Sequence, residues 1–151
     1  MEMSSSTLII GRTEDATRMS KARTLEKWPH LELDPIDVVA LAKLCVFVTG
    51  DRYDTVIKSF VNQTPKQPDV EPWDFENLLN PVMLIPERYV HALADMEDED
   101  LPKLAKKWCA IEEFKFYKFD PKDIEGNLRD CRKFAARCLK AKRSLLFLLA
   151  P

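Results

Sequence analysis

The sequence is poor in glycine and histidine and has no long apolar run. Its 151 residues include only three glycines and two histidines. Three glycines are too few for a glycine-rich sandwich or for a loop that cradles phosphates. The longest apolar run, residues 145–150, is about a third of the roughly 20 residues that a membrane-spanning helix needs. We therefore expect a protein that does not span a membrane.

Several familiar motifs are absent as well. The chain has no HExxH, GxSxG, GxxxxGKS/T or GxGxxG pattern, which excludes the common kinds of nucleotide-binding enzyme. Near the N-terminus, Glu2, Glu14 and Asp15 argue against a signal or transit peptide. We expect a cytoplasmic protein that carries no cofactor.

The four cysteines, Cys45, Cys109, Cys131 and Cys138, form no CxxC pair and have no histidine at zinc spacing. Cys131 and Cys138 share a helix face two turns apart, about 10 Å, which is too far for a disulfide. We expect reduced, buried thiols and no metal site.

Length and composition favour one helical domain. A chain of this size buries about two-thirds of its surface on folding, enough for one core. Hydrophobic residues make up 46% of the chain and charged residues 32%, which is typical of a soluble, helix-rich protein. We predict a mainly α single domain at 25–151 with two or three short strands. A mobile leader at 1–24, in which STLII forms a short strand or nothing, precedes it. Five helices are expected, at about 35–49, 52–61, 86–96, 99–114 and 121–141.

Prolines and a glycine mark the expected ends of these elements. Asp34 before Pro35, and Asp120 before Pro121, are typical of an N-cap followed by a first-turn proline. Gly50 is a typical C-terminal cap. The strand candidates are 28–33, 82–86 and 145–150. We expect the last of these to pair with either of the other two, or else to continue the preceding helix.

An acidic stretch, DMEDED at 95–100, precedes the fourth helix. Asp98 or Asp100 is expected to cap this helix, with Pro102 tolerated in its first turn. The neighbouring acids would face the positive end of the helix dipole. The stretch is thus explained without a ligand.

Three side chains are candidates for chemistry: Glu112, His30 and His91. Glu112 follows Trp108 by four residues, so we expect it at the edge of the buried helix face, where a raised pKa would suit an acid or base. Neighbouring helical residues diverge by about 100°, so Glu112 and Glu113 would not form a facing pair. The alternative is that Glu112 bonds an arginine, a histidine or a backbone end, and that His91 is a packed or capping residue. His30 is more open to function, but the sequence shows no partner for it.

Charge is uneven along the chain. Residues 66–114 hold 5 basic and 12 acidic side chains, whereas residues 115–151 hold 10 basic and 4 acidic ones. One face of the last helix carries Arg129, Lys133, Arg137 and Lys140. Such a face can track phosphates. Because neither interleaved aromatics nor a recognised nucleic-acid motif accompanies it, we favour a solvated face or internal acid-base pairing.

A long connection at 62–81 contains four prolines together with Trp73 and Phe75. Aromatic side chains on a loop are typical anchors for a protein partner. Trp73 and Phe75 are therefore our candidate partner-binding residues.

Three stretches, WPHLEL, DEDLPKLAKKWCAIEEF and AKRSLLFLL, together with ALA, resemble an uncharacterised family of small bacterial proteins. The similarity covers residues 26–150 and implies a bacterial, cytoplasmic, single-domain protein, with no functional residue to carry over. Our leading hypothesis is a non-enzymatic interaction protein, such as an immunity- or antitoxin-like inhibitor or an adaptor, and homo-oligomers stay open. The alternatives are a small enzyme of unrecognised type using Glu112 with His30 or His91, and a nucleic-acid-associated protein using the basic last helix.

Overall fold

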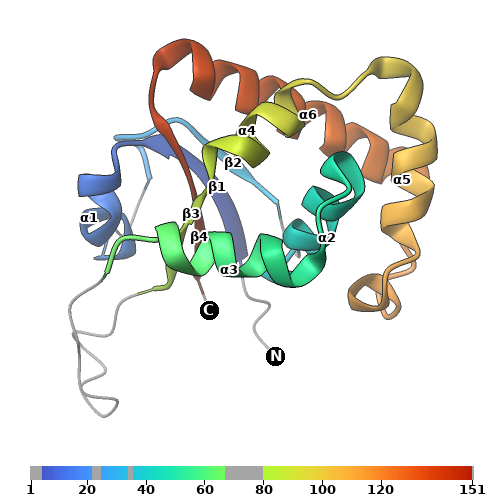
Figure 1. The fold of residues 1–151 in the computed structure, drawn as a ribbon, viewed down its shortest axis with the longest axis horizontal. Helices are drawn as coiled ribbons and strands as arrows, with labels where there is room; N and C mark the ends of the chain where they lie inside the picture. Colours follow the sequence, from blue (N-terminus) through green and yellow to red (C-terminus); the bar gives the residue numbers. More distant parts are fainter. Residues whose placement is uncertain (1–4, 22–24, 34–35, 67–79, 151) are drawn as a thin grey trace.

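A computed structural model describes residues 5–21, 25–33, 36–66 and 80–150 (Figure 1). Six α-helices and four β-strands lie in these residues, so the mainly helical prediction is confirmed, but the expected five helices and two or three strands are too few. The α-helices are α1 (Ala16–Lys21), α2 (Val38–Thr49), α3 (Tyr53–Gln63), α4 (Glu87–Ala94), α5 (Leu101–Cys109) and α6 (Pro121–Ala141). The strands are β1 (Ser5–Gly11), β2 (His30–Glu32), β3 (Val82–Ile85) and β4 (Ser144–Ala150), and short 3-10 turns are η1 (Thr13–Asp15), η2 (Asp98–Asp100) and η3 (Glu112–Phe114).

The four strands form one antiparallel sheet in the order β2-β1-β4-β3. The C-terminal apolar segment is therefore a strand, as expected, and not a continuation of α6. It pairs with β3, one of the two partners that we expected, and with β1, which we did not expect.

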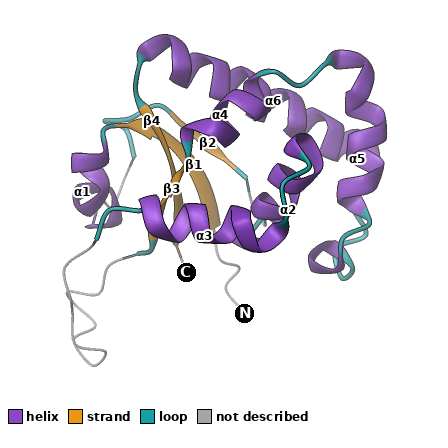
Figure 2. Cartoon of the chain, viewed as in Figure 1, coloured by secondary structure: helices purple, strands orange, loops and turns teal. Residues whose placement is uncertain are grey.

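Both faces of the sheet are covered, which explains why β4 and residues 8–10 of β1 are apolar without alternation. Leu8 and Phe147 belong to the main core, beneath the larger group of helices. Ile9 and Leu146 point to the opposite face and pack with Met19 of α1. Figure 2 shows α1 alone on one side of the sheet and the other helices on the other side.

The predicted mobile leader is wrong for residues 5–21. β1 is an inner strand that pairs with β2 and β4, and both Leu8 and Ile9 are fully buried. Gly11 ends this strand next to the Met19 side chain, whose Cε atom would lie 2.5 Å from a Cβ at this position and would have to move. The folded domain thus includes residues 5–21.

Two of the predicted helix ends are confirmed. Gly50 ends α2 in the left-handed conformation, with a φ of 77°, and its N–H donates to the Val46 carbonyl. Asp120 caps α6, and its side chain accepts from the Lys122 N–H at 2.9 Å.

Other predicted ends are wrong. The N-cap of α2 is Asp37, which accepts from the Ala40 N–H at 2.8 Å, whereas Asp34 and Pro35 lie outside the described residues. The helix expected at 99–114 ends at Cys109, because the backbone is extended at Ile111. This break lets Phe114 fold back, so that its ring centre lies 5.3 Å from that of Trp108.

Asp51, in the turn after α2, connects this turn to α4 through hydrogen bonds. The Arg88 guanidinium donates two hydrogen bonds of 2.8 Å to its carboxylate, and the Tyr89 hydroxyl donates a third at 2.9 Å. These hydrogen bonds lower the pKa of Asp51 to about 2.

The cysteines are unpaired thiols, as expected, and three of the four are buried. Burial raises the pKa of Cys131 to about 12 and that of Cys138 to about 11, so these thiols stay protonated at neutral pH. In the described part of the chain, no helix is both long and apolar enough to cross a bilayer.

Candidate functional site

The candidate partner-binding residues Trp73 and Phe75 lie outside the described residues. The candidate nucleic-acid surface on α6 is described. Lys133, Arg137 and Lys140 are exposed along it, whereas Arg129 donates to the Glu125 carboxylate at 2.7 Å. Part of the surface is thus neutralised within the helix itself.

Glu112 does not occupy the place that we expected. Because α5 ends at Cys109, Glu112 lies on η3 and is exposed to solvent instead of lying at the edge of a buried face. Its neighbour Glu113 is the half-buried one, and it forms an ion pair with Lys43, the charge near the middle of α2. The Glu113 pair therefore has a structural role, joining η3 to α2.

The two histidines lie on different elements. His30 is exposed on β2, and its Nδ1 atom lies 3.0 Å from the Trp28 carbonyl oxygen. His91 is exposed on α4, and its Nε2 atom lies 3.4 Å from the Glu87 carboxylate. Neither of the two cavities described below is lined by Glu112 or His30.

The acidic stretch at 95–100 precedes α5, but no aspartate side chain caps this helix. Asp100 occupies the N-cap position without a capping hydrogen bond, so the predicted capping role is wrong. Asp98 instead forms an ion pair of 2.6 Å with Arg132 of α6. This pair supports the expected internal pairing of the acidic and basic parts of the chain.

The most unusual surface feature is the segment Phe-Lys-Phe-Tyr-Lys-Phe at 114–119, which we call the aromatic loop. Phe116 is 90% exposed and Tyr117 is 43% exposed. Lys115 and Lys118 beside them are exposed too. Figure 1 shows the turn below α5 at the edge of the molecule, away from the sheet.

A series of ring contacts, two edge-to-face and one stacked, connects the aromatic loop to the core. Phe114 packs edge-on against the fully buried Trp108, and its ring centre lies 5.0 Å from that of Phe119. Phe119 in turn stacks with Tyr117, at 5.3 Å and an interplanar angle of 11°. The Trp108 indole N–H donates to the Ala40 carbonyl at 2.9 Å. The loop is thus held from below, while Phe116 projects into solvent.

Lys118 adopts a left-handed backbone conformation, with a φ of 32°. A lysine is seldom found in this region, which favours glycine and asparagine. The strain is tolerated because the rings on either side fix the turn, and such strain is more frequent at functional sites than elsewhere.

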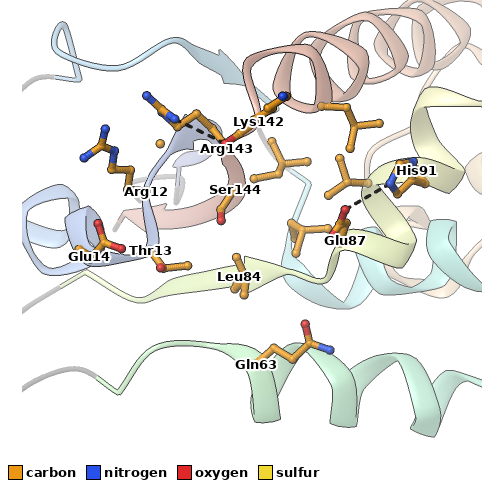
Figure 3. Close-up of a pocket in the computed structure, with 15 residues that line it drawn as sticks. Arg12, Thr13, Glu14, Gln63, Leu84, Glu87, His91, Lys142, Arg143 and Ser144 are labelled. Carbon is orange, nitrogen blue, oxygen red and sulfur yellow. Dashed lines mark hydrogen bonds and ion pairs between the residues drawn. The ribbon is translucent and has the colours of Figure 1, made fainter.

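A cavity of about 620 Å³ lies at one end of the sheet, where β1 and β3 end and β4 begins (Figure 3). Arg12 and Arg143 lie on one side of it, and Glu87 lies beside His91 on the other. The remaining lining residues are apolar side chains, hydroxyl groups and a few further charged groups: Leu84, Ile85, Val90, Leu139, Leu145, Thr13, Ser144, Glu14, Lys142, Gln63 and Gly11.

A second hollow, of about 490 Å³, lies between α2, α4 and α5. Phe47, Val48 and Leu104 give it an apolar base, and the Lys107 ammonium lies 4.7 Å from the centre of the Phe47 ring. Asp95 contributes to its acidic edge. In the described residues, no group of three or more His, Cys, Asp or Glu side chains is arranged to hold a metal ion.

Sequence reasoning missed both the aromatic loop and the cavity. The loop had a signal, since aromatic and lysine residues are interleaved at 114–119, but these residues lay at the end of an expected helix and in the gap after it. The cavity had no signal in the sequence, because its residues come from separate segments of the chain.

Comparison of the chain with protein-family models found no matching family, and comparisons with curated proteins and with solved structures found no significant match. The resemblance to small bacterial proteins therefore stays a prediction.

Proposed function

We propose that this chain is a non-enzymatic interaction protein, of the inhibitor or adaptor kind, that binds another protein through the aromatic loop. The observation that carries this proposal is the 90% exposure of Phe116 on a turn whose neighbouring rings are packed onto the core. Aromatic side chains in fixed positions are typical anchors of protein interfaces, because they bury a large apolar area at little cost in conformational entropy.

The surroundings of Phe116 indicate the chemistry of its partner. Lys115 and Lys118 are exposed directly beside Phe116 and Tyr117 within the loop, whereas the exposed carboxylates Glu112 and Asp120 lie outside it. A complementary surface would offer an apolar pocket for Phe116 with carboxylates at its edge. We therefore propose an acidic protein partner. The resemblance to small bacterial proteins is the support for a further proposal, a bacterial, cytoplasmic setting.

The enzyme alternative has less support. Glu112 is exposed, and it lines neither described cavity, whereas His91 lines the larger one together with Glu87. A site that joins Glu112 to either histidine would need a rearrangement of η3, whose Glu113 is paired with Lys43.

A nucleic-acid partner is the second candidate, and one observation favours it. The aromatic loop leads directly into α6, whose exposed Lys133, Arg137 and Lys140 continue the positive charge. Aromatic rings beside lysines are the usual means of holding single-stranded nucleic acid.

The test is a pull-down with the tagged full chain from a lysate of its source cell. We expect a stoichiometric protein partner that is lost with Phe116→Ala plus Tyr117→Ala. Val61→Ala is the matched control, since Val61 is 59% exposed on α3, away from the loop, and it should leave capture unchanged. Capture that survives the double substitution would contradict the proposal. Co-purifying nucleic acid, seen in the absorbance ratio and removed by salt, would favour the second candidate instead.

A further inference from the structure

The cavity at the end of the sheet concentrates positive charge in a way that the fold does not need. Gly11 and Ser144 form the last residue pair between β1 and β4 at this end. Arg12 and Arg143 are the next residues outward on the two strands, so two guanidinium groups flank one point of the sheet edge (Figure 3). Like charges in such facing positions repel each other.

Lys142 adds a third positive charge, in a strained conformation. It follows α6 with a φ of 55°, at a position where glycine is preferred. The Arg143 backbone N–H donates to the Cys138 carbonyl at 3.3 Å, and this hydrogen bond fixes the turn at the C-terminal end of α6. The position therefore carries a lysine although glycine would cost less.

Ion pairs between described residues do not neutralise this group. None of those found within 4 Å includes Arg12, Lys142 or Arg143. Two carboxylates also line the cavity: Glu14 takes part in none of these ion pairs, and Glu87 lies on the opposite side, 3.4 Å from the His91 Nε2 atom. Apart from one hydrogen bond of 3.5 Å from the Arg143 guanidinium to the Lys142 carbonyl, the two guanidinium groups are available to an anion, and the electrostatic cost of grouping them would be offset by its binding.

The remainder of the lining indicates what the anion would be attached to. Leu84 and Leu139, which are half-buried, provide accessible apolar surface, and Ser144 lies between Leu84 and the two arginines (Figure 3). A volume of about 620 Å³ is within the range of small-molecule sites. We propose that this cavity binds a small molecule with a phosphate or carboxylate group, held by Arg12 and Arg143, on an apolar body.

This site is separate from the aromatic loop. The loop precedes the first residue of α6 and the cavity lies at its last, and a helix of 21 residues is roughly 30 Å long. The two proposals can therefore succeed or fail independently.

The test uses the full chain, with phenyl phosphate, benzoate, inorganic phosphate and phenol as separate probes, followed by amide chemical shifts in NMR. We expect either aryl anion to shift Arg12, Thr13 and Ser144 with a Kd of about 1 mM or lower, and the tighter of the two identifies the preferred head group. Phenol and inorganic phosphate each carry only half of the recognised chemistry and should bind more weakly.

The variant is Arg12→Gln plus Arg143→Gln, and the control is Lys133→Gln plus Arg137→Gln, which removes the same charge from exposed positions outside the cavity. The first pair should raise the Kd about tenfold or more, and the control should leave it unchanged. All four residues are exposed, so the variants should fold, which thermal melts will check. The proposal is overturned if neither aryl anion binds, if both variants weaken binding equally, or if phenol or inorganic phosphate binds as well as phenyl phosphate.

Discussion

Shortening either of two side chains in β1 should strongly destabilise the protein. Leu8 and Ile9 are both fully buried, but on opposite faces of the sheet, Leu8 beneath the main group of helices and Ile9 beneath α1. Replacing a buried leucine or isoleucine by alanine costs about 2–5 kcal/mol, because apolar contacts are lost and a cavity is left. We expect Leu8→Ala and Ile9→Ala each to lower the free energy of unfolding by about 3 kcal/mol.

The assay is urea denaturation followed by far-UV circular dichroism. A loss of this size is a large part of the roughly 5–15 kcal/mol that stabilises a typical domain, so the midpoint should move clearly. Lys21→Ala, an exposed residue in the same N-terminal segment, should change the stability by less than about 0.5 kcal/mol. If the two β1 variants behaved like Lys21→Ala, the N-terminal segment would be outside the core and the described sheet would be wrong.

Three further predictions follow from single contacts. Asp51→Asn should make the free energy of unfolding fall less between about pH 4 and pH 2. Because the pKa of Asp51 is lower in the folded than in the unfolded protein, its ionised carboxylate stabilises the fold at pH values above the unfolded-state pKa. This stabilisation is lost as the pH falls toward about 2, and denaturation at several pH values will measure the loss. Lys142→Gly should raise the free energy of unfolding by about 1 kcal/mol, since glycine adopts a φ of 55° without strain, and a lower melting temperature would refute this account of the turn. Phe119→Ala should cost about 1–3 kcal/mol through its lost ring contacts, whereas Phe116→Ala should change stability by less than about 0.5 kcal/mol; equal effects in denaturation would contradict the described packing.

The main helices were predictable from sequence because each has a long apolar period or a strong end signal. Asp120 with Pro121 and Gly50 set helix ends through local backbone chemistry, which needs no knowledge of the remainder of the chain. The C-terminal strand was predictable for a related reason, since a short segment that is apolar on both sides suits the inside of a covered sheet.

A strand at STLII was one of two options left open and is confirmed by β1, but the place of the N-terminal segment inside the sheet was not predictable because its signals are too short. β1 has only a brief apolar run, and α1 spans six residues, fewer than two helical turns. Their positions are decided by partners distant in sequence, namely β4 and the residues around Met19.

The candidate site depended on one helix end. Extending the helical period of α5 to residue 114 placed Glu112 at a buried edge. The helix instead ends at Cys109, which exposes Glu112 and is accompanied by packing of Phe114 onto Trp108. This is a tertiary contact overriding a local pattern. The cavity is harder still to foresee, because Arg12 and Arg143 are neighbours only through the pairing of β1 with β4.

The most direct test of whether the aromatic loop binds a protein partner is photo-crosslinking in the source cell. The photoreactive residue p-benzoylphenylalanine is placed at position 116 or, as the control, at position 61. Both side chains are largely exposed, so the probe should not disturb folding at either site. We predict one crosslinked protein species from position 116 and none of that mass from position 61. No adduct at position 116, or the same adducts from both positions, would contradict the claim that Phe116 contacts a specific protein partner.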